Sequence, residues 1–179
     1  MPRWELAALV LLPLVASGAP RRGAAPGASS VRPDTVASRC RAPERREFDF
    51  WLGRWTVTDT AGRVVGHSEI TRVSGGCGIL EHWMGRDGVG GRSLNAYDPT
   101  SGDWTQFWVG EGGLVLHLTG GLRGSSMVLS GRRTGTGGEV LDRIIWTPSG
   151  NGEVRQHWEV SRDGGSTWNT VFDGRYAPS

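Results

Sequence analysis

The stretch RSLNAYDPTSGDWTQFWV, which runs from Arg92 to Val109, holds two strand-like runs separated by the turn residues PTSGD. Because successive side chains in a strand point to opposite faces, Trp104, Gln106 and Trp108 share one face of the second run. Proline, serine, glycine and aspartate between two such runs are typical of a turn that reverses the chain. The stretch therefore predicts two neighbouring antiparallel strands.

The same alternation of runs and turns extends from Trp55 to Tyr176. The strand-like runs are residues 55–59, 63–73, 76–84, 92–98, 103–109, 114–118, 126–132, 140–147, 153–160 and 167–176. Glycine-centred turns separate them, and the single helical candidate is the short segment 42–53. The sequence has no repeat of about 40–50 residues, which a β-propeller requires. We therefore predict an all-β domain, a single antiparallel up-and-down β-barrel of about ten strands, because closure removes the exposed strand edges.

The first residues have the composition of a secretory signal peptide. Arg3 precedes the apolar run Leu6–Val15, and small residues follow it. This order predicts a signal peptide over residues 1–18, and the run is too short to span a bilayer. Residues 19–44, rich in Arg, Pro, Ala and Gly, predict a disordered linker, which leaves residues 45–179 for the barrel. We therefore expect a secreted or periplasmic protein with no integral membrane segment after cleavage.

Charge is divided unevenly along the chain. Residues 19–46 carry seven Arg against Asp34 and Glu44, a net charge of +5, whereas residues 47–179 carry twelve Arg against fifteen acidic residues, a net charge of −3. Nucleic-acid-binding domains present a basic face, so we expect no nucleic-acid partner for this mildly acidic barrel. The chain contains no Lys, which excludes Schiff-base chemistry and a P-loop lysine.

The two cysteines of the chain are Cys40 and Cys77. In an exported chain, two cysteines and no other thiol favour a disulfide, whereas a redox role would need a C-x-x-C motif, which is absent from the sequence. We expect this bond to tie the end of the linker to the third strand. In the chain-entropy model it contributes roughly 4 kcal/mol to stability.

The stretch SRDGGSTW, from Ser161 to Trp168, resembles the Asp-box of sialidases. Sialidase-type propellers carry several copies, one per blade, whereas this chain has one copy and too few residues for such blades. We interpret the stretch as a hairpin turn in which Asp163 accepts backbone N–H bonds and Gly164 and Gly165 adopt positive φ, with Trp168 packed beneath. This structural interpretation gives no support for a glycosidase.

The segment EFDFWLGRW, from Glu47 to Trp55, contains Gly53-x-Trp55, which resembles the G-x-W signature of lipocalins and the wider calycin group. More narrowly, the chain is similar to a bacterial secreted family of lipocalin-like domains of unknown function. That pattern opens F-D-F-W-x-G-x-W, continues Y-D-x-x-x-G-x-W-x-Q-x-W and ends F-D-G-x-Y, over residues 47–176 here. The resemblance implies a calycin-like barrel that Trp55 closes at one end. In such barrels an Arg from the last strands commonly stacks over this Trp, so we expect Arg175 to lie against Trp55.

Alternation also gathers polar and aromatic side chains on the predicted inner face. The set is Glu81, Trp83, Asn95, Tyr97, Gln106, Trp108, Gln156 and Trp158. Aromatic walls with a few polar groups are typical of small-ligand cavities, so we predict that the lumen binds a small apolar or amphipathic ligand. Two alternatives stay open. One is a structural or envelope-interaction module whose core these side chains fill, and the other is an enzyme that uses Glu81 as general acid–base, with Asp142 as a possible partner carboxylate.

The sequence assigns no metal site and no catalytic residue. The four histidines, at positions 67, 82, 117 and 157, lack metal-binding spacing, and no nucleophile elbow is present. One cofactor alternative comes from the resemblance, because some calycin-like barrels bind haem through a strand histidine, and His117 is the candidate here. The pattern leaves the oligomeric state open.

Overall fold

A computed structural model of the chain describes residues 40–179. The predicted signal peptide, residues 1–18, and the predicted linker up to residue 39 lie outside the described residues. Between residues 40 and 179, no helix has the length and apolar character needed to cross a membrane.

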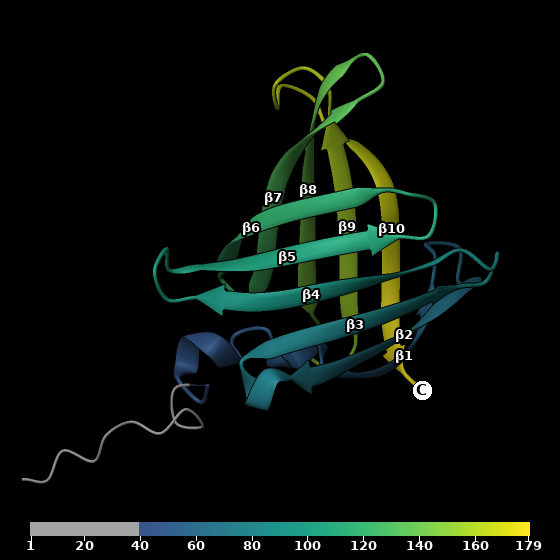
Figure 1. Ribbon diagram of the computed structural model, residues 1–179. Helices are drawn as coiled ribbons and strands as arrows, with labels where there is room; N and C mark the ends of the chain where they lie inside the picture. The colour runs from purple at the N-terminus through teal and green to yellow at the C-terminus, as the bar shows by residue number, and fades with distance from the viewer. Residues whose placement is uncertain (1–39) are drawn as a thin grey trace, which may run out of the picture. The chain divides into compact units, whose positions relative to one another are not determined.

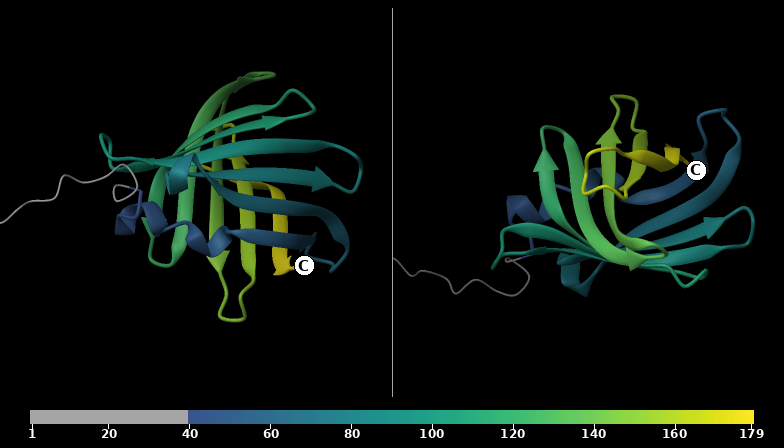
Figure 2. Two further views of the ribbon diagram at one scale, coloured as in Figure 1. Left: turned by 60° about the horizontal axis from the view of Figure 1, so that its bottom comes forward. Right: turned by 90° about the horizontal axis from the view of Figure 1, so that it is seen from above.

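Ten antiparallel strands form a closed barrel in the described part of the chain. The strands are β1 (Gly53–Thr58), β2 (Val64–Val73), β3 (Gly78–Gly85), β4 (Gly90–Asp98), β5 (Asp103–Gly110), β6 (Val115–Arg123), β7 (Ser126–Gly135), β8 (Gly138–Pro148), β9 (Val154–Ser161) and β10 (Asn169–Pro178). Each strand pairs with the next along the chain, and β10 closes the circle against β1, where Val57 lies opposite Tyr176. Figure 1 and Figure 2 show this meander curving around a common interior. The predicted up-and-down barrel of about ten strands is therefore confirmed.

Alternation along each strand divides the side chains between interior and solvent. In β8, Val140, Ile144 and Trp146 are buried, whereas the residues between them on the other face are partly exposed. The pairing register then sets which inward groups meet, as where Glu81 of β3 lies opposite Ser93 of β4. A slip of one residue would turn each of these groups to the other face, so the register positions the polar side chains of the interior.

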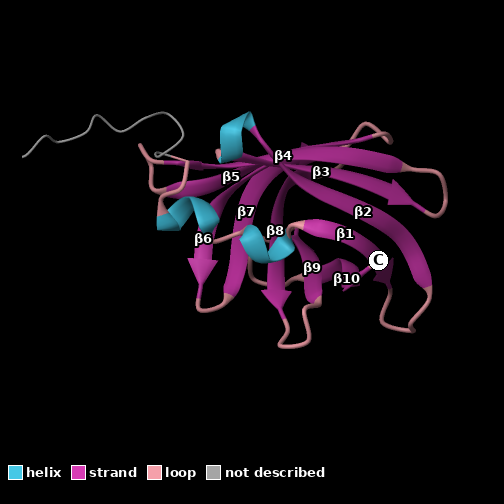
Figure 3. Cartoon of the chain, turned by 90° about the horizontal axis from the view of Figure 1, so that it is seen from below, coloured by secondary structure: helices cyan, strands magenta, loops and turns pink. Residues whose placement is uncertain are grey.

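The segment before β1 fills one end of the barrel and forms a plug. It contains two short 3₁₀ turns, η1 (Pro43–Arg46) and η2 (Asp49–Trp51), which Figure 3 shows lying across that end. Phe48 and Trp51 are fully buried, and their rings stack with centroids 4.9 Å apart. Trp146 packs edge-on against Phe48, with 5.1 Å between ring centroids. Large apolar side chains therefore occupy this half of the interior and leave the other half for a cavity.

Gly53 and Trp55 join the plug to the first strand. A Cβ atom at Gly53 would lie 3.4 Å from the Trp55 ring, so glycine lets the backbone pass close to the indole. The indole N–H of Trp55 donates to the carbonyl oxygen of Trp51 at 3.0 Å. The Trp55 ring also meets Tyr176 of β10 edge-on, with centroids 6.2 Å apart. Plug, first strand and last strand thus meet at this tryptophan.

The expected stack of Arg175 on Trp55 is wrong. Arg175 lies opposite Thr58 in the pairing of β10 with β1, whereas Trp55 lies opposite Pro178. The Arg175 side chain is 69 % exposed, while Trp55 is buried. The physical reason is alternation, because Tyr176 buries its ring and the residue before it must then point to the solvent face.

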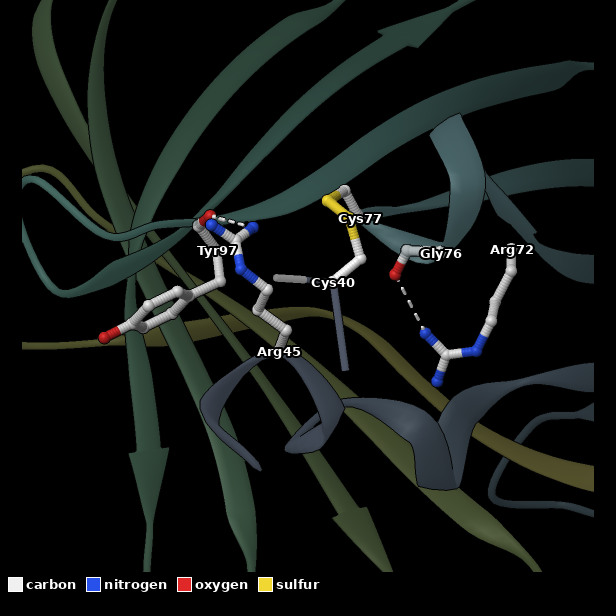
Figure 4. Close-up of a disulfide and its surroundings, with 6 residues drawn as sticks. All are labelled: Cys40, Arg45, Arg72, Gly76, Cys77 and Tyr97. Atoms are coloured by element: carbon white, nitrogen blue, oxygen red, sulfur yellow. Dashed lines mark hydrogen bonds between the residues drawn. A yellow bond between two sulfur atoms is a disulfide. The ribbon is translucent and has the colours of Figure 1, made fainter. Parts of the chain in front are cut away.

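Cys40 and Cys77 form the predicted disulfide, with Cα atoms 4.6 Å apart. Cys77 directly follows a third 3₁₀ turn, η3 (Ser74–Gly76), and precedes β3. Figure 4 shows the bond between the segment that leads into the plug and the start of this strand. The disulfide therefore joins the plug to the barrel wall.

The predicted linker extended to residue 44, but residues 40–44 are held against the barrel. The carbonyl oxygen of Glu44 accepts a hydrogen bond from the indole of Trp104 at 3.1 Å. Arg45 donates to the carbonyl oxygen of Tyr97 at 3.1 Å (Figure 4). These contacts and the disulfide order a segment whose composition is that of a linker, which corrects the boundary.

Candidate ligand-binding cavity

A cavity of about 190 Å³ lies inside the barrel. Its walls come from β3, β5, β6, β8, β9 and β10. The lining residues are Glu81, Trp83, Gln106, Trp108, Leu116, Ile144, Gln156, Trp158, Val171, Phe172 and Tyr176. The lining is mostly aromatic and aliphatic, with one carboxylate and two amides among the apolar groups. This composition is typical of sites that enclose a small molecule and orient it with a few polar contacts.

Glycines on neighbouring strands make room for two of the tryptophan rings. Gly66 of β2 lies next to Trp83, and a Cβ atom at this glycine would lie 2.6 Å from the ring. Gly91 of β4 lies next to Trp108, and a Cβ atom there would collide with that ring. Any side chain larger than hydrogen at these two positions would displace an indole. The two glycines therefore let the indole rings of Trp83 and Trp108 pack against the strands and leave the cavity open.

The cavity reaches solvent beside a β-bulge in β10. The register of β10 against β9 shifts between Thr170 and Phe172, so Val171 is the extra residue of the bulge. Val171 lines the cavity and is 50 % exposed. Strand β1 ends at Thr58, which lies opposite Arg175 of β10. Among residues 40–179, the part of β10 that precedes Arg175 therefore pairs only with β9. The exposed Val171 lies on this part of β10.

Glu81 supplies the carboxylate of the cavity and is 4 % exposed. The Ser68 hydroxyl donates to Oε1 of Glu81 at 3.2 Å, and the Ser93 hydroxyl donates to Oε2 at 2.9 Å. Burial raises the pKa of Glu81 to about 7, and the two serine hydrogen bonds offset part of that effect. The group is therefore close to half ionised at neutral pH.

The side-chain amides of Asn95 and Gln106 extend the hydrogen-bond network behind Ser93. The Asn95 amide nitrogen donates to Oγ of Ser93 at 2.9 Å, and the Gln106 amide nitrogen donates to Oδ1 of Asn95 at 2.8 Å. The Asn95 amide nitrogen also donates to the carbonyl oxygen of Ile79 at 3.2 Å, and the chain from Gln106 through Asn95 and Ser93 ends at Glu81. Aligned donors of this kind strengthen one another, so the network favours the ionised carboxylate.

Tyr176 presents its hydroxyl to the same interior. The hydroxyl donates to Oε1 of Gln156 at 2.5 Å. Burial, and to a smaller extent the charge of Glu81, raise the pKa of Tyr176 well above its ordinary value. The phenol therefore stays protonated and fixes the orientation of the Gln156 amide.

The second inward-facing carboxylate, Asp142, already has a cationic partner. Nε of Arg133 donates to Oδ2 of Asp142 at 2.8 Å, and the indole N–H of Trp158 donates to Oδ1 at 2.9 Å. The Arg133–Asp142 pair carries no net charge, whereas the hydrogen-bond partners of Glu81 are uncharged serines. Asp142 is therefore engaged in a structural ion pair and is not free to act as a second acid–base group.

Most of the predicted site residues line the cavity, and two do not. Those in the lining are Glu81, Trp83, Gln106, Trp108, Gln156 and Trp158. Asn95 is fully buried and acts through its hydrogen bonds, and Tyr97 packs against Trp104 at the plugged end, with ring centroids 6.3 Å apart. Alternation identifies the face of a side chain but not its height along the barrel, which is why the prediction misplaced both.

Sequence reasoning missed part of the wall. The missed lining residues are Leu116, Ile144, Val171, Phe172 and Tyr176. The F-D-G-x-Y spacing was a usable signal for the aromatic pair, because residues four apart in a strand share a face. The bulge at Val171 left no signal in the sequence.

His117 lies outside the lumen. Leu116 and Leu118 on either side of it are buried, and alternation places His117 on the exposed face of β6. The haem alternative needed this histidine inside the barrel, so the geometry contradicts it. Among residues 40–179, no three His, Cys, Asp or Glu side chains cluster in a way that could hold a metal ion.

The Asp-box-like stretch forms the turn between β9 and β10. Asp163 accepts a hydrogen bond from the backbone N–H of Thr167 at 2.9 Å, and Gly164 and Gly165 adopt φ of 70° and 94°. The indole of Trp168 donates to the carbonyl oxygen of Gly165 at 3.1 Å. These hydrogen bonds stay within the turn, and none of its residues lines the cavity.

No protein-family model matches the chain, and no curated protein matches it in sequence. The function is therefore inferred from what the cavity offers chemically, which is an apolar enclosure, aromatic faces and one acidic group.

Proposed function

We propose that this barrel binds a small apolar or amphipathic molecule in its lumen. The observation that carries the proposal is the cavity of about 190 Å³, which five aromatic side chains wall and which opens beside the bulge in β10. In a purely structural module with a filled core, a carboxylate and two amides in an apolar wall would lower stability, because burying polar groups away from water is unfavourable. These groups make hydrogen bonds within the barrel, and a bound ligand would add a polar contact on the cavity side.

The volume of the cavity limits the part of the ligand that it encloses. An apolar cavity of about 150 Å³ holds a molecule the size of benzene. At about 190 Å³, this cavity has room for a single ring or a branched head group. A longer chain attached to that group would leave through the opening beside Val171.

A pair of filling variants on one strand tests luminal binding. Leu116 lines the cavity, whereas its neighbour Val115 is 46 % exposed on the outer face of β6. We expect Leu116→Trp to fill the cavity and lower the affinity for toluene at least tenfold, while Val115→Trp leaves it unchanged. Ligand-observed NMR and calorimetry measure both affinities, and Ile144→Phe serves as a milder filling variant if Leu116→Trp does not fold. Equal toluene binding by the filled and control variants would exclude a luminal site.

An enzyme on the same barrel is the second candidate, and one observation favours it. The pKa of Glu81 is about 7, where a carboxyl group both donates and accepts a proton near neutral pH. Chemistry that needs two free carboxylates is not supported, because Asp142 is paired with Arg133. The protein would be shown to be an enzyme if it converted a bound compound and if Glu81→Gln abolished this turnover while the compound still bound.

We also propose that the protein is exported to the periplasm or secreted. The Cys40–Cys77 disulfide supports export, because such bonds persist in oxidising compartments. The composition of residues 1–18 supports it independently. Sequencing the N-terminus of the full chain after expression should give a start near Gly18, and an uncleaved chain retained in the cytoplasm would contradict the proposal.

A further inference from the structure

We propose that the luminal ligand carries a positive charge, as a protonated amine or a quaternary ammonium group, and that this group binds against Glu81 between aromatic rings. The inference rests on the proposed function and narrows the ligand to one chemical class. Three features carry it, namely a carboxylate without a compensating charge, the polarity of the hydrogen bonds around it and the aromatic rings beside it.

Two carboxylates at the barrel interior, Asp49 and Asp142, are paired with arginines, whereas Glu81 is not. Arg72 forms an ion pair with Asp49 at the plugged end, and Arg133 forms one with Asp142. Glu81 is about as deeply buried as Asp142 and more deeply than Asp49, but it has only hydroxyl partners. A buried carboxylate without a cation is unfavourable. A cationic ligand in the adjoining cavity supplies the missing charge.

The hydrogen bonds around Glu81 suit an anion. Both carboxylate oxygens accept from serine hydroxyls, and the Ser93 oxygen in turn accepts from Asn95 at 2.9 Å. The proton of the Ser93 hydroxyl is therefore directed at Glu81. A protonated Glu81 could accept from only one of the two serines, and the other hydroxyl would have to turn and accept the carboxyl proton, whereas the ionised group accepts from both. The arrangement fits a carboxylate that binds a cation better than an acid that donates to a neutral ligand.

Aromatic rings stand beside the carboxylate. Trp83 lies two residues from Glu81 on the same face of β3, and its ring centroid is 5.9 Å from that of Phe172 and 6.5 Å from that of Tyr176. Ring faces attract cations that lie within about 6 Å of the centroid, and desolvation strengthens this attraction. A ligand carboxylate would instead meet the like charge of Glu81. The site therefore selects ligands with a cationic head over those with an anionic one.

Choline and 3,3-dimethylbutanol test the charge of the ligand, because they share a shape and differ in having nitrogen or carbon at the branch point. We expect calorimetry at pH 8, with the disulfide intact, to show at least about tenfold tighter binding of choline. Glu81→Gln should remove most of this preference, since only the aromatic rings then favour the cation, and should leave the affinity for 3,3-dimethylbutanol within about twofold of the native value. Equal affinities of the two probes for the native protein would overturn the inference.

The pH dependence of the native protein tests the same inference without a variant. Choline affinity should fall about tenfold from pH 8 to pH 6, because Glu81 with a pKa of about 7 becomes largely protonated, whereas 3,3-dimethylbutanol affinity should not change. Ser68 and Ser93 contact Glu81 directly, Gln106, Gln156 and Tyr176 line the cavity beside it, and the Arg133–Asp142 pair lies behind the lining residue Trp158. The serines and glutamines do not titrate, and burial keeps Tyr176 protonated. A choline affinity that does not change with pH would overturn the inference.

A toluene titration under the same conditions separates the two proposals. Toluene binding without any preference for choline rejects the cationic ligand and retains luminal binding. If toluene, choline and 3,3-dimethylbutanol all fail to bind, luminal binding itself is rejected, and the inference falls with it.

Discussion

Replacing Glu81 by glutamine should change how the stability of the empty barrel depends on pH. Burial raises the pKa of Glu81 from an ordinary value of 4.5 to about 7. Below pH 4.5 the carboxyl group is protonated in both the folded and the unfolded chain. Between pH 4.5 and 7 it ionises in the unfolded chain only, so the free energy of unfolding falls as pH rises through this window. Above pH 7 the loss is complete.

The size of the loss follows from the shift in pKa. One pKa unit corresponds to about 1.4 kcal/mol, so the whole loss amounts to about 3 kcal/mol, of which about 2 to 3 kcal/mol falls between pH 5 and pH 8. Glu81→Gln keeps an acceptor for the serine hydroxyls but cannot ionise, so the variant should not show this loss. Its stability relative to the native protein should therefore be about 2 to 3 kcal/mol higher at pH 8 than at pH 5.

Urea denaturation at pH 5 and pH 8, with the disulfide intact and no ligand present, measures these differences. The exposed Glu139, substituted as Glu139→Gln, is the matched control and should follow the native protein at both pH values. Other groups titrate in the same range, but their effects cancel when native protein and variant are compared. If the free energy of unfolding changed by the same amount between pH 5 and pH 8 in Glu81→Gln and in the native protein, the reasoning about the buried carboxylate would be refuted.

Three further predictions concern the turn, the cavity wall and the disulfide. Asp163→Ala should lower the melting temperature by removing hydrogen bonds within the turn and leave toluene affinity unchanged, and a loss of affinity at an unchanged melting temperature would instead place a site there. Gly91→Ala should force an indole into the cavity and weaken toluene binding, whereas Gly112→Ala, where an added Cβ meets only open space, should not, and equal effects would contradict the role of the glycine. Thiol titration of the denatured, unreduced protein should find no free thiol, and two titratable thiols would exclude the Cys40–Cys77 bond.

The barrel could be predicted from the sequence because its determinants are local. The stretch from Arg92 to Val109 became β4, the turn and β5, with boundaries within about two residues of the predicted runs. Alternation of side chains and turn residues act over a few positions, so they can be read without knowing the partners of a strand. The disulfide was equally accessible, because two cysteines in an exported chain leave one pairing.

The content of the interior could be predicted only in part. Alternation placed Trp108 and Tyr97 on the inner face, yet Trp108 walls the cavity while Tyr97 lies at the plugged end. Their height along the barrel depends on strand tilt and on where the plug docks, and both are properties of the closed sheet. Arg175 was misplaced for a simpler reason, because the burial of Tyr176 assigns its neighbour to the outside.

The sequence by itself determined that Glu81 faces inward, since its place in an alternating strand is a local property. Only the tertiary structure decided that Glu81 lacks a cationic partner. The register of β7 against β8 brings Arg133 to Asp142, and the docking of the plug brings Asp49 to Arg72. Which charges meet depends on distances across strands that are far apart in the chain, and those distances exist only after the barrel has closed.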